Sequence, residues 1–292
     1  MNFVERSIKS ITTKGITYIK KRTLKKHPPA FIIAGAQKSG TSSLHYYLSQ
    51  HPNLLGSTPK EVRYFDRDDN FRKGKKWYHR SFVNLHANKK DFLCFEATPE
   101  YLYRSYVPQR IHQEYPHLKI IIILRDPVKR AYSAWNMYKH FFKVKRIPQG
   151  YVHKKENNLV TEFFKADKFP LFEEAIASEI LKIENNSTLE EPGLLRRGIY
   201  MPQIKRYHDL FGKDHVLILG MGDLNKNKKE CLNNILRFLN LKESEWNFLP
   251  VEKRNTGSYS EQMNIETKEK LYAFFESHNN ALFKYLGTNI NW

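Results

Sequence analysis

The sequence predicts a single P-loop-like α/β domain with a mostly parallel central sheet and helices on both faces. Short apolar runs alternate with longer segments of helical periodicity, which is the pattern of parallel strands joined by crossover helices. The segment Lys119–Leu124 contains four consecutive isoleucines, as expected of a strand buried on both faces. The first apolar run leads through a glycine loop into a helix, which is the arrangement of a phosphate-binding loop.

Each element follows from its own pattern. Strands are expected where short apolar runs rich in β-branched or aromatic residues occur, at Phe31–Ala34, Asp91–Phe95, Lys119–Leu124 and, again as a buried strand, Val216–Leu219. Helices are expected where apolar residues recur every three or four positions, at Ser42–Leu48, Pro127–Phe142, Leu171–Ile183, Tyr200–Phe211, Glu230–Leu239 and Thr267–Leu286. Residues 143–168 are polar and basic without a strong period, and we expect a surface loop or lid there.

Composition excludes several classes of protein. The 292 residues include 40% hydrophobic and 14% aromatic residues, which indicates a packed globule and not a disordered chain. Two cysteines, Cys94 and Cys231, exclude a disulfide scaffold and a thiolate zinc site, and we expect both as buried thiols. No window approaches 18 apolar residues, and the N-terminus lacks the apolar core of a signal peptide. The expected location is cytoplasmic, or the Golgi lumen only if an anchor has been removed.

The chain carries 49 Lys and Arg against 30 Asp and Glu, a net charge of +19 that attracts polyanions. Charge alone does not choose among nucleic acid, an anionic membrane face, an acidic polysaccharide and a phosphorylated cofactor. Residues 1–28 are predicted to form a separate basic amphipathic arm, and residues 29–292 the main domain. For residues 1–27 two interpretations stay open: contact with a membrane surface, or a helix packed on the domain or solvated.

The loop Gly35–Ser43 follows the first strand and opens a helix, and its two glycines and hydroxyl groups form a phosphate cradle. An ATPase loop has a lysine directly before the hydroxyl residue. Here Thr41 occupies that lysine position, and Lys38 lies inside the loop instead. The sequence therefore predicts a phosphate site without the ATPase signature, made by Lys38, Ser39, Gly40, Thr41, Ser42 and Ser43.

A second site is predicted at the carboxyl end of the isoleucine strand. Arg125 stands at that end, Asp126 is a candidate helix cap, and Pro127 suits the first helical turn. Ser133 then lies about two turns into the helix, where it and Arg125 are placed to clamp a second phosphate. The alternative interpretation is an ordinary capped helix with a surface arginine.

Together these loops resemble the sulfotransferases that use 3′-phosphoadenosine 5′-phosphosulfate (PAPS): the first is similar to their 5′-phosphosulfate loop, the second to their 3′-phosphate motif. The resemblance covers about residues 30–292 and is nearest to the carbohydrate, heparan-sulfate-type branch. Further segments in the same order are similar to that family: Pro59–Asp66, Phe95–Tyr101, Arg197–Leu224, Lys253–Tyr259 and the closing helix Phe274–Gly287.

The resemblance implies in-line transfer of a sulfuryl group from PAPS to a hydroxyl of a carbohydrate acceptor, leaving 3′-phosphoadenosine 5′-phosphate (PAP). Glu61 is then the general base, and Lys38 stabilises the leaving group. No metal is expected. The cofactor-binding residues implied are Lys38, Ser39, Gly40, Thr41, Ser42, Ser43, Arg125, Ser133, Tyr200, Arg254, Asn255 and Gly257.

Two departures from the heparan-sulfate branch leave the acceptor open. Arg63 stands where that branch usually has His, and Ala97 where it usually has a lysine that contacts the acidic acceptor. We expect acceptor contacts from Lys60, Arg63 and Asp66. Cations in the expected lid form either a rim for an anionic glycan or a solvated loop: Lys143, Lys145, Arg146, Lys154 and Lys155.

Three alternatives remain from the sequence. One is a phosphate-loop nucleotide kinase or NTPase, against which stand the missing Gly-Lys-Ser/Thr and the Arg125 and Ser133 pair. Another is a sulfotransferase that acts on a non-carbohydrate alcohol. The third is a nucleic-acid-binding protein, which only the charge suggests; since no recognition module is evident, no specific nucleic acid partner is expected.

Overall fold

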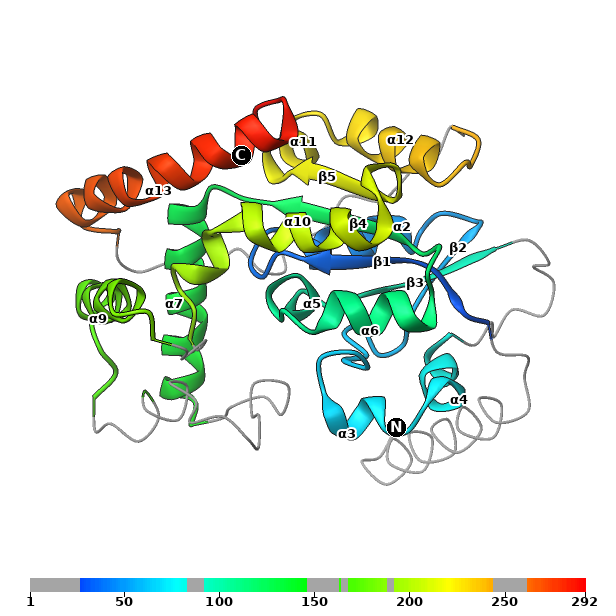
Figure 1. Ribbon diagram of the computed structural model, residues 1–292, viewed down its shortest axis with the longest axis horizontal. Coiled ribbons are helices and arrows are strands. Elements are labelled where there is room, and N and C mark those ends of the chain that lie inside the picture. The colour runs from blue at the N-terminus through cyan, green and yellow to red at the C-terminus, as the bar shows by residue number, and fades with distance from the viewer. Residues whose placement is uncertain (1–26, 83–91, 146–162, 164–167, 188–191, 244–261) are drawn as a thin grey trace, which may run out of the picture.

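The computed structural model describes residues 27–82, 92–145, 163, 168–187, 192–243 and 262–292 (Figure 1). In this part of the chain a five-stranded sheet has the order β2-β3-β1-β4-β5, and every neighbouring pair is parallel. Its strands are β1 (Pro29–Gly35), β2 (Leu54–Gly56), β3 (Leu93–Ala97), β4 (Lys119–Leu124) and β5 (Val216–Gly220). The predicted parallel α/β class is therefore confirmed.

The six helices expected between residues 42 and 286 are present, with ends within two residues of the prediction. The helices in order are α2 (Thr41–Leu48), α3 (Asp68–Phe71), α4 (Lys75–Tyr78), α5 (Glu100–Tyr103), α6 (Val107–Glu114), α7 (Pro127–Lys143), α9 (Phe172–Glu184), α10 (Tyr200–Phe211), α11 (Met221–Lys226), α12 (Lys228–Phe238) and α13 (Ile265–Leu286). The sequence did not predict β2, nor the short helices α3 to α6 and α11.

The isoleucine strand explains why helices cover both faces of the sheet. Side chains alternate along a strand, so Ile120 and Ile122 face one core and Ile121 and Ile123 face the other, and all four are fully buried. The first core is closed by α6 and α10, and the second by α2 and α12. Burial on both faces is what a central strand of a parallel sheet requires.

The last strand differs from its prediction. Val216–Leu219 was expected to be a buried strand, but Leu217 and Ile218 are partly exposed. The reason is the strand order, because β5 is the edge of the sheet and pairs only with β4 among the described residues.

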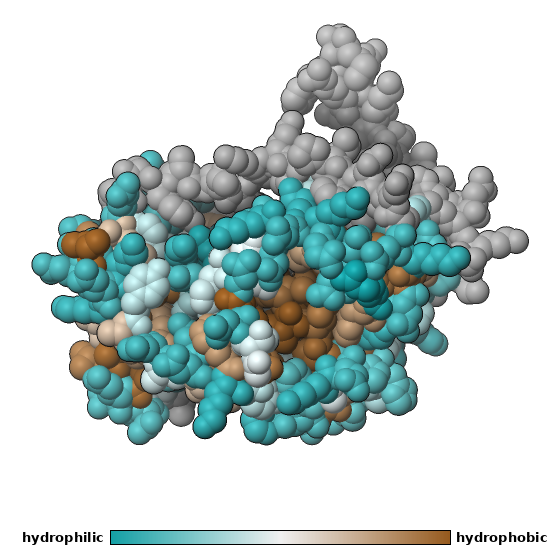
Figure 2. Space-filling model, turned by 90° about the horizontal axis from the view of Figure 1, so that it is seen from above, coloured by the Kyte–Doolittle hydropathy of each residue, from teal (hydrophilic) through white to brown (hydrophobic). Residues whose placement is uncertain are grey.

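Figure 2 views the molecule from the side where β5, α12 and α13 lie, and it shows apolar surface in a hollow framed by hydrophilic side chains.

A third core joins α7, α9 and α13 beside the sheet. Trp135 of α7 packs on Phe172 of α9, and Phe275 of α13 lies in the same cluster. The indole N–H of Trp135 also donates to the Pro170 carbonyl at 3.1 Å. In Figure 1 the arrows of β1, β4 and β5 point toward α7, so this cluster stands at the carboxyl ends of the strands.

Both cysteines are buried free thiols, as predicted. Burial raises the pKa of Cys94 and of Cys231 to about 12, so neither is a reactive thiolate near neutral pH. Among the described helices, none is both long enough and apolar enough to cross a bilayer.

Candidate active site

The loop after β1 presents backbone N–H groups at the carboxyl edge of the sheet. Lys38 and Gly40 have φ angles of 64° and 89°, in the left-handed region, and this turns the chain sharply into α2. The N-cap residue of α2 is Gly40, so no side chain there accepts a hydrogen bond from the first N–H groups of the helix. The N–H groups of the first turn therefore face outward from the helix end, where an anion is stabilised.

Gln37 adds polar groups to this loop that sequence reasoning did not single out. The residue is 5% exposed, yet neither its amide nitrogen nor its amide oxygen has a hydrogen-bond partner in the described part of the chain. Buried polar groups are normally paired. The loop thus fits a polar, anionic ligand better than it fits an apolar one.

The ammonium group of Lys38 lies among charges from two other loops. Burial lowers its pKa, the guanidinium groups of Arg125 and Arg130 lower it further, and the carboxylate of Glu61 opposes them. These effects require proximity. The fold therefore brings together three residues that the sequence predicted as a site, from segments far apart in the chain.

Arg125 links the second loop to the first. Its guanidinium NH1 donates to the Lys38 carbonyl at 3.0 Å, and its own carbonyl accepts from the Tyr200 hydroxyl at 2.8 Å. Tyr200 is 2% exposed. We expected Tyr200 to contact the cofactor; what the structure displays is its hydroxyl bound to the backbone of Arg125.

The helix that follows Arg125 starts as predicted. Asp126 caps it by accepting from the Lys129 N–H at 2.9 Å, and Pro127 occupies its first position. Ser133 lies two turns in and is 3% exposed. Of the two predicted clamp residues, Arg125 thus lies in the β4–α7 connection and Ser133 within α7.

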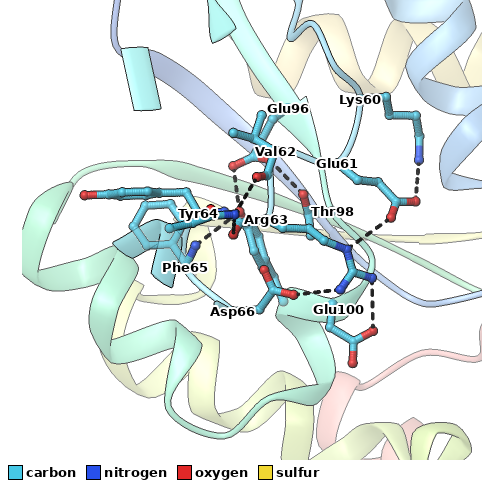
Figure 3. Close-up of polar contacts among 12 residues, drawn as sticks. Lys60, Glu61, Val62, Arg63, Tyr64, Phe65, Asp66, Glu96, Thr98 and Glu100 are labelled. Atoms are coloured by element: carbon cyan, nitrogen blue, oxygen red, sulfur yellow. Dashed lines mark hydrogen bonds and ion pairs between the residues drawn. The ribbon is translucent and has the colours of Figure 1, made fainter. Parts of the chain in front are cut away.

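Glu61 lies on a third loop, between β2 and α3, and Figure 3 shows its polar contacts. Its side chain is 31% exposed and stands between two cations: Lys60 Nζ is 3.1 Å from its Oε1, and Arg63 Nε is 3.7 Å from its Oε2. The carboxylate is therefore accessible to a substrate while its charge is balanced from both sides.

Two of the three predicted acceptor contacts are buried against other protein groups. Arg63 is 7% exposed and Asp66 is 1% exposed, and Arg63 NH1 is 3.2 Å from Asp66 Oδ2. Burial raises the pKa of Asp66 to about 6, although the Arg63 guanidinium opposes that rise. The third, Lys60, has 24% of its side-chain surface exposed to solvent.

A buried carboxylate on α5 gathers guanidinium groups. Glu100 Oε1 is 2.6 Å from Arg197 NH2 and 3.2 Å from Arg104 Nε, and Glu100 Oε2 is 3.8 Å from Arg63 NH2. Burial alone would raise the pKa of Glu100, but these guanidinium groups hold it well below its usual range. Sequence reasoning did not bring these residues together, although Glu100, Arg63 and Arg197 each lie in a segment that resembles the family.

A second buried carboxylate anchors the Glu61 loop. Glu96 accepts hydrogen bonds from the hydroxyls of Tyr78 at 2.5 Å, Thr98 at 2.8 Å and Tyr101 at 3.0 Å. Burial raises the pKa of Glu96 to about 7. The Tyr101 hydroxyl also accepts from the Tyr64 N–H at 2.9 Å, so the loop is tied to β3 through one shared oxygen.

Some predicted residues fall outside the described residues. These are Arg254, Asn255 and Gly257 of the late cofactor loop, Arg146, Lys154 and Lys155 of the basic rim, and residues 1–26 of the arm. Lys143 and Lys145 are described and exposed at the end of α7. The rim and the arm stay predictions.

Residues 28–264 match the family model described as the sulfotransferase domain. The membrane-associated sulfotransferase kil1 of Dictyostelium discoideum is 23% identical over 90% of this chain and 66% of its own length. Bifunctional heparan sulfate N-deacetylase/N-sulfotransferase 1 of Caenorhabditis briggsae is 25% identical over 91% of this chain. The chain spans only 31% of that relative's length.

The crystal structure of a sulfotransferase from Alicyclobacillus acidocaldarius has a similar fold. It superposes with a TM-score of 0.66 at 27% identity and covers 90% of this chain and 98% of that one.

Proposed function

This chain belongs to the sulfotransferase family, and from that premise we propose that it transfers a sulfuryl group from PAPS to a hydroxyl of a carbohydrate acceptor. One arrangement carries the proposal: the charges of Arg125 and Glu61 both act on the Lys38 ammonium group, and Arg125 is hydrogen-bonded to the Lys38 backbone. A phosphate loop, a second cation and an accessible carboxylate thus meet at one edge of the sheet.

The residues around this edge suit the donor. Lys38 and the N–H groups of residues 39–43 would hold its 5′-phosphosulfate, and Arg125 with Ser133 its 3′-phosphate. Gln37, buried and unpaired in the described part of the chain, adds an amide to the same loop. The donor supplies an activated sulfuryl group. We also propose that Arg254, Asn255 and Gly257 complete the 3′-phosphate end.

The chemistry needs positioning and charge stabilisation more than covalent help, because sulfuryl transfer, like phosphoryl transfer, passes through a loose in-line transition state. Glu61 accepts the proton of the acceptor hydroxyl late, as the new oxygen–sulfur bond forms. Lys38 donates to the oxygen between sulfur and phosphorus, where negative charge grows. Removing one such donor typically costs about 10²–10³ in rate.

The acceptor is proposed as a glycan. One relative is named for heparan sulfate and another as membrane-associated. The exposed Lys143 and Lys145 suit an anionic glycan. We further propose that the protein is cytoplasmic, or peripheral at a membrane through residues 1–27.

Calorimetry with PAP and with ADP tests the donor. We expect micromolar binding of PAP, about −8 kcal/mol, that depends on the 3′-phosphate and is weakened in Arg125→Ala. ADP binding as tight as PAP binding would contradict the 3′-phosphate clamp and favour the phosphate-loop kinase.

Transfer of radiolabelled sulfate from PAPS tests the acceptor and the base. O-desulfated, N-acetylated heparin offers sugar hydroxyls, and a simple alcohol serves as the non-carbohydrate comparison. In Glu61→Gln we expect PAP binding to persist while transfer falls by about 10² or more. Undiminished transfer in that variant would exclude Glu61 as the base.

A further inference from the structure

The guanidinium group of Arg63 faces three carboxylates, each through a different nitrogen (Figure 3). Nε is 3.7 Å from Glu61, NH1 is 3.2 Å from Asp66, and NH2 is 3.8 Å from Glu100. We propose that Arg63 is a positioning residue that holds the Glu61 carboxylate against a buried charge cluster, and not a ligand of the acceptor. The inference rests on the proposed role of Glu61.

Arg63 has little left to offer an acceptor. A guanidinium presents its N–H groups in a rigid planar fork, and here each side of the fork is directed at a protein carboxylate. The residue is 7% exposed. An acceptor would therefore have to displace one of these carboxylates, and two of them, Asp66 and Glu100, are themselves buried.

The backbone of the loop also needs to be held. Glu61 and Arg63 have φ angles of 60° and 54°. These lie in the left-handed region that residues other than glycine, Asn and Asp seldom adopt. Such conformations persist when surrounding contacts determine them. The Arg63 carbonyl accepts from Asn70 Nδ2 at 2.9 Å, and the Tyr64 N–H donates to the Tyr101 hydroxyl at 2.9 Å. These hydrogen bonds hold the backbone of the loop, and the ion pairs of Arg63 add contacts from its side chain.

The cluster reaches the donor side of the site. Glu100, which pairs with Arg63, is 2.6 Å from Arg197 NH2. Arg197 lies in the 3₁₀ turn directly before α10, and the first residue of α10, Tyr200, donates to the Arg125 carbonyl at 2.8 Å. A chain of contacts therefore joins the catalytic carboxylate to the residue proposed to clamp the 3′-phosphate.

Arg104 provides a matched control. It is fully buried, and its Nε is 3.2 Å from the same Glu100 carboxylate. Arg104→Gln thus removes one buried guanidinium from the cluster while the ion pair between Arg63 and Glu61 stays in place.

The test compares Arg63→Gln, Arg63→Lys and Arg104→Gln with the wild-type protein. Readouts are kcat and acceptor KM with PAPS and O-desulfated, N-acetylated heparin, PAP affinity by calorimetry, and Tm. In Arg63→Gln we expect kcat to fall by about 10–100-fold, since small misplacement of a catalytic group is costly, while acceptor KM and PAP affinity stay unchanged. Arg63→Lys, which keeps the charge, should recover part of kcat, and Arg104→Gln should lower Tm with little effect on kcat.

Two results would overturn the inference alone: a raised acceptor KM with kcat retained in Arg63→Gln, which identifies an acceptor ligand, or kcat unchanged in every Arg63 variant. If Arg63→Gln does not fold, the KM and kcat of Arg63→Lys decide between the same two roles. Absence of transfer by the wild-type protein would instead remove the proposed function, and this inference with it.

Discussion

The carboxyl group of Glu96 is completely buried and accepts three hydroxyl hydrogen bonds, and burial raises its pKa from about 4.5 to about 7. Between these two values the folded protein holds a proton that the unfolded chain releases. The contribution of Glu96 to stability is therefore fully present below pH 4.5 and is lost as the pH rises through about 7.

Glu96→Gln removes this titration. We expect the free energy of unfolding of the variant, relative to wild type, to rise by up to about 3 kcal/mol between pH 4.5 and pH 7. Urea unfolding of both proteins at several pH values measures that difference. His45, whose pKa burial lowers to about 4, titrates in the opposite sense, but it is present in both proteins and cancels. A difference that does not vary with pH would contradict the assignment.

The sequence predicts the positions of some site residues well and the positions of others not at all. Lys38 and Arg125 follow the ends of apolar runs, so strand geometry alone places them at the same edge of the sheet. The pairing of Glu100 with Arg63 and Arg197 has no such signal. It depends on how α5, the Glu61 loop and the turn before α10 pack together, and no periodicity within one segment encodes that.

The N-termini of α7 and α13 offer a comparison between two helix caps. Asp126 Oδ1 accepts from the Lys129 N–H at 2.9 Å, and Asn264 Oδ1 accepts from the Glu266 N–H at 2.8 Å. We expect Asp126→Ala and Asn264→Ala each to lower stability by about 1 kcal/mol. Because Asp126 directly follows Arg125, only Asp126→Ala should also weaken PAP binding.

Thermal unfolding and calorimetry with PAP measure the two effects separately. Asp126 also accepts from the Tyr272 hydroxyl at 3.1 Å, so its variant should be the less stable of the two. Equal PAP affinity in both variants would show that the start of α7 does not position the clamp.

Among whole elements, length decides what the sequence predicts. The long helices α7 and α13 span four or more turns, and their apolar spacing is unambiguous. The strand β2 and the helices α3 and α4 span only three or four residues, which is too short for a period to register. The partial exposure of β5 follows from strand order, which local patterns do not contain.

The net charge of +19 belongs to the molecule as a whole and favours any polyanion. We expect binding to an arbitrary DNA duplex to fall by about 10³ or more between roughly 50 and 200 mM salt, as it does for purely electrostatic contacts. PAP binding should fall much less, since at its proposed site Lys38 is half-buried and Ser133 is buried. Titrations at two salt concentrations compare the ligands, and a DNA complex that persists at about 200 mM would indicate specific recognition.

The hydrogen bond from Arg125 to the Lys38 carbonyl joins the two loops that we propose bind phosphate groups into one frame. Most of the ordering entropy of that frame is spent during folding and not during ligand capture. On the proposed assignment, a nucleotide bound by the first loop at its 5′ group already holds its 3′-phosphate near the second loop. Binding at the second loop is then intramolecular, so the two loops together act as a chelator. An analogue with only one of the two groups loses that chelate advantage, and a competitive inhibitor gains most by keeping both.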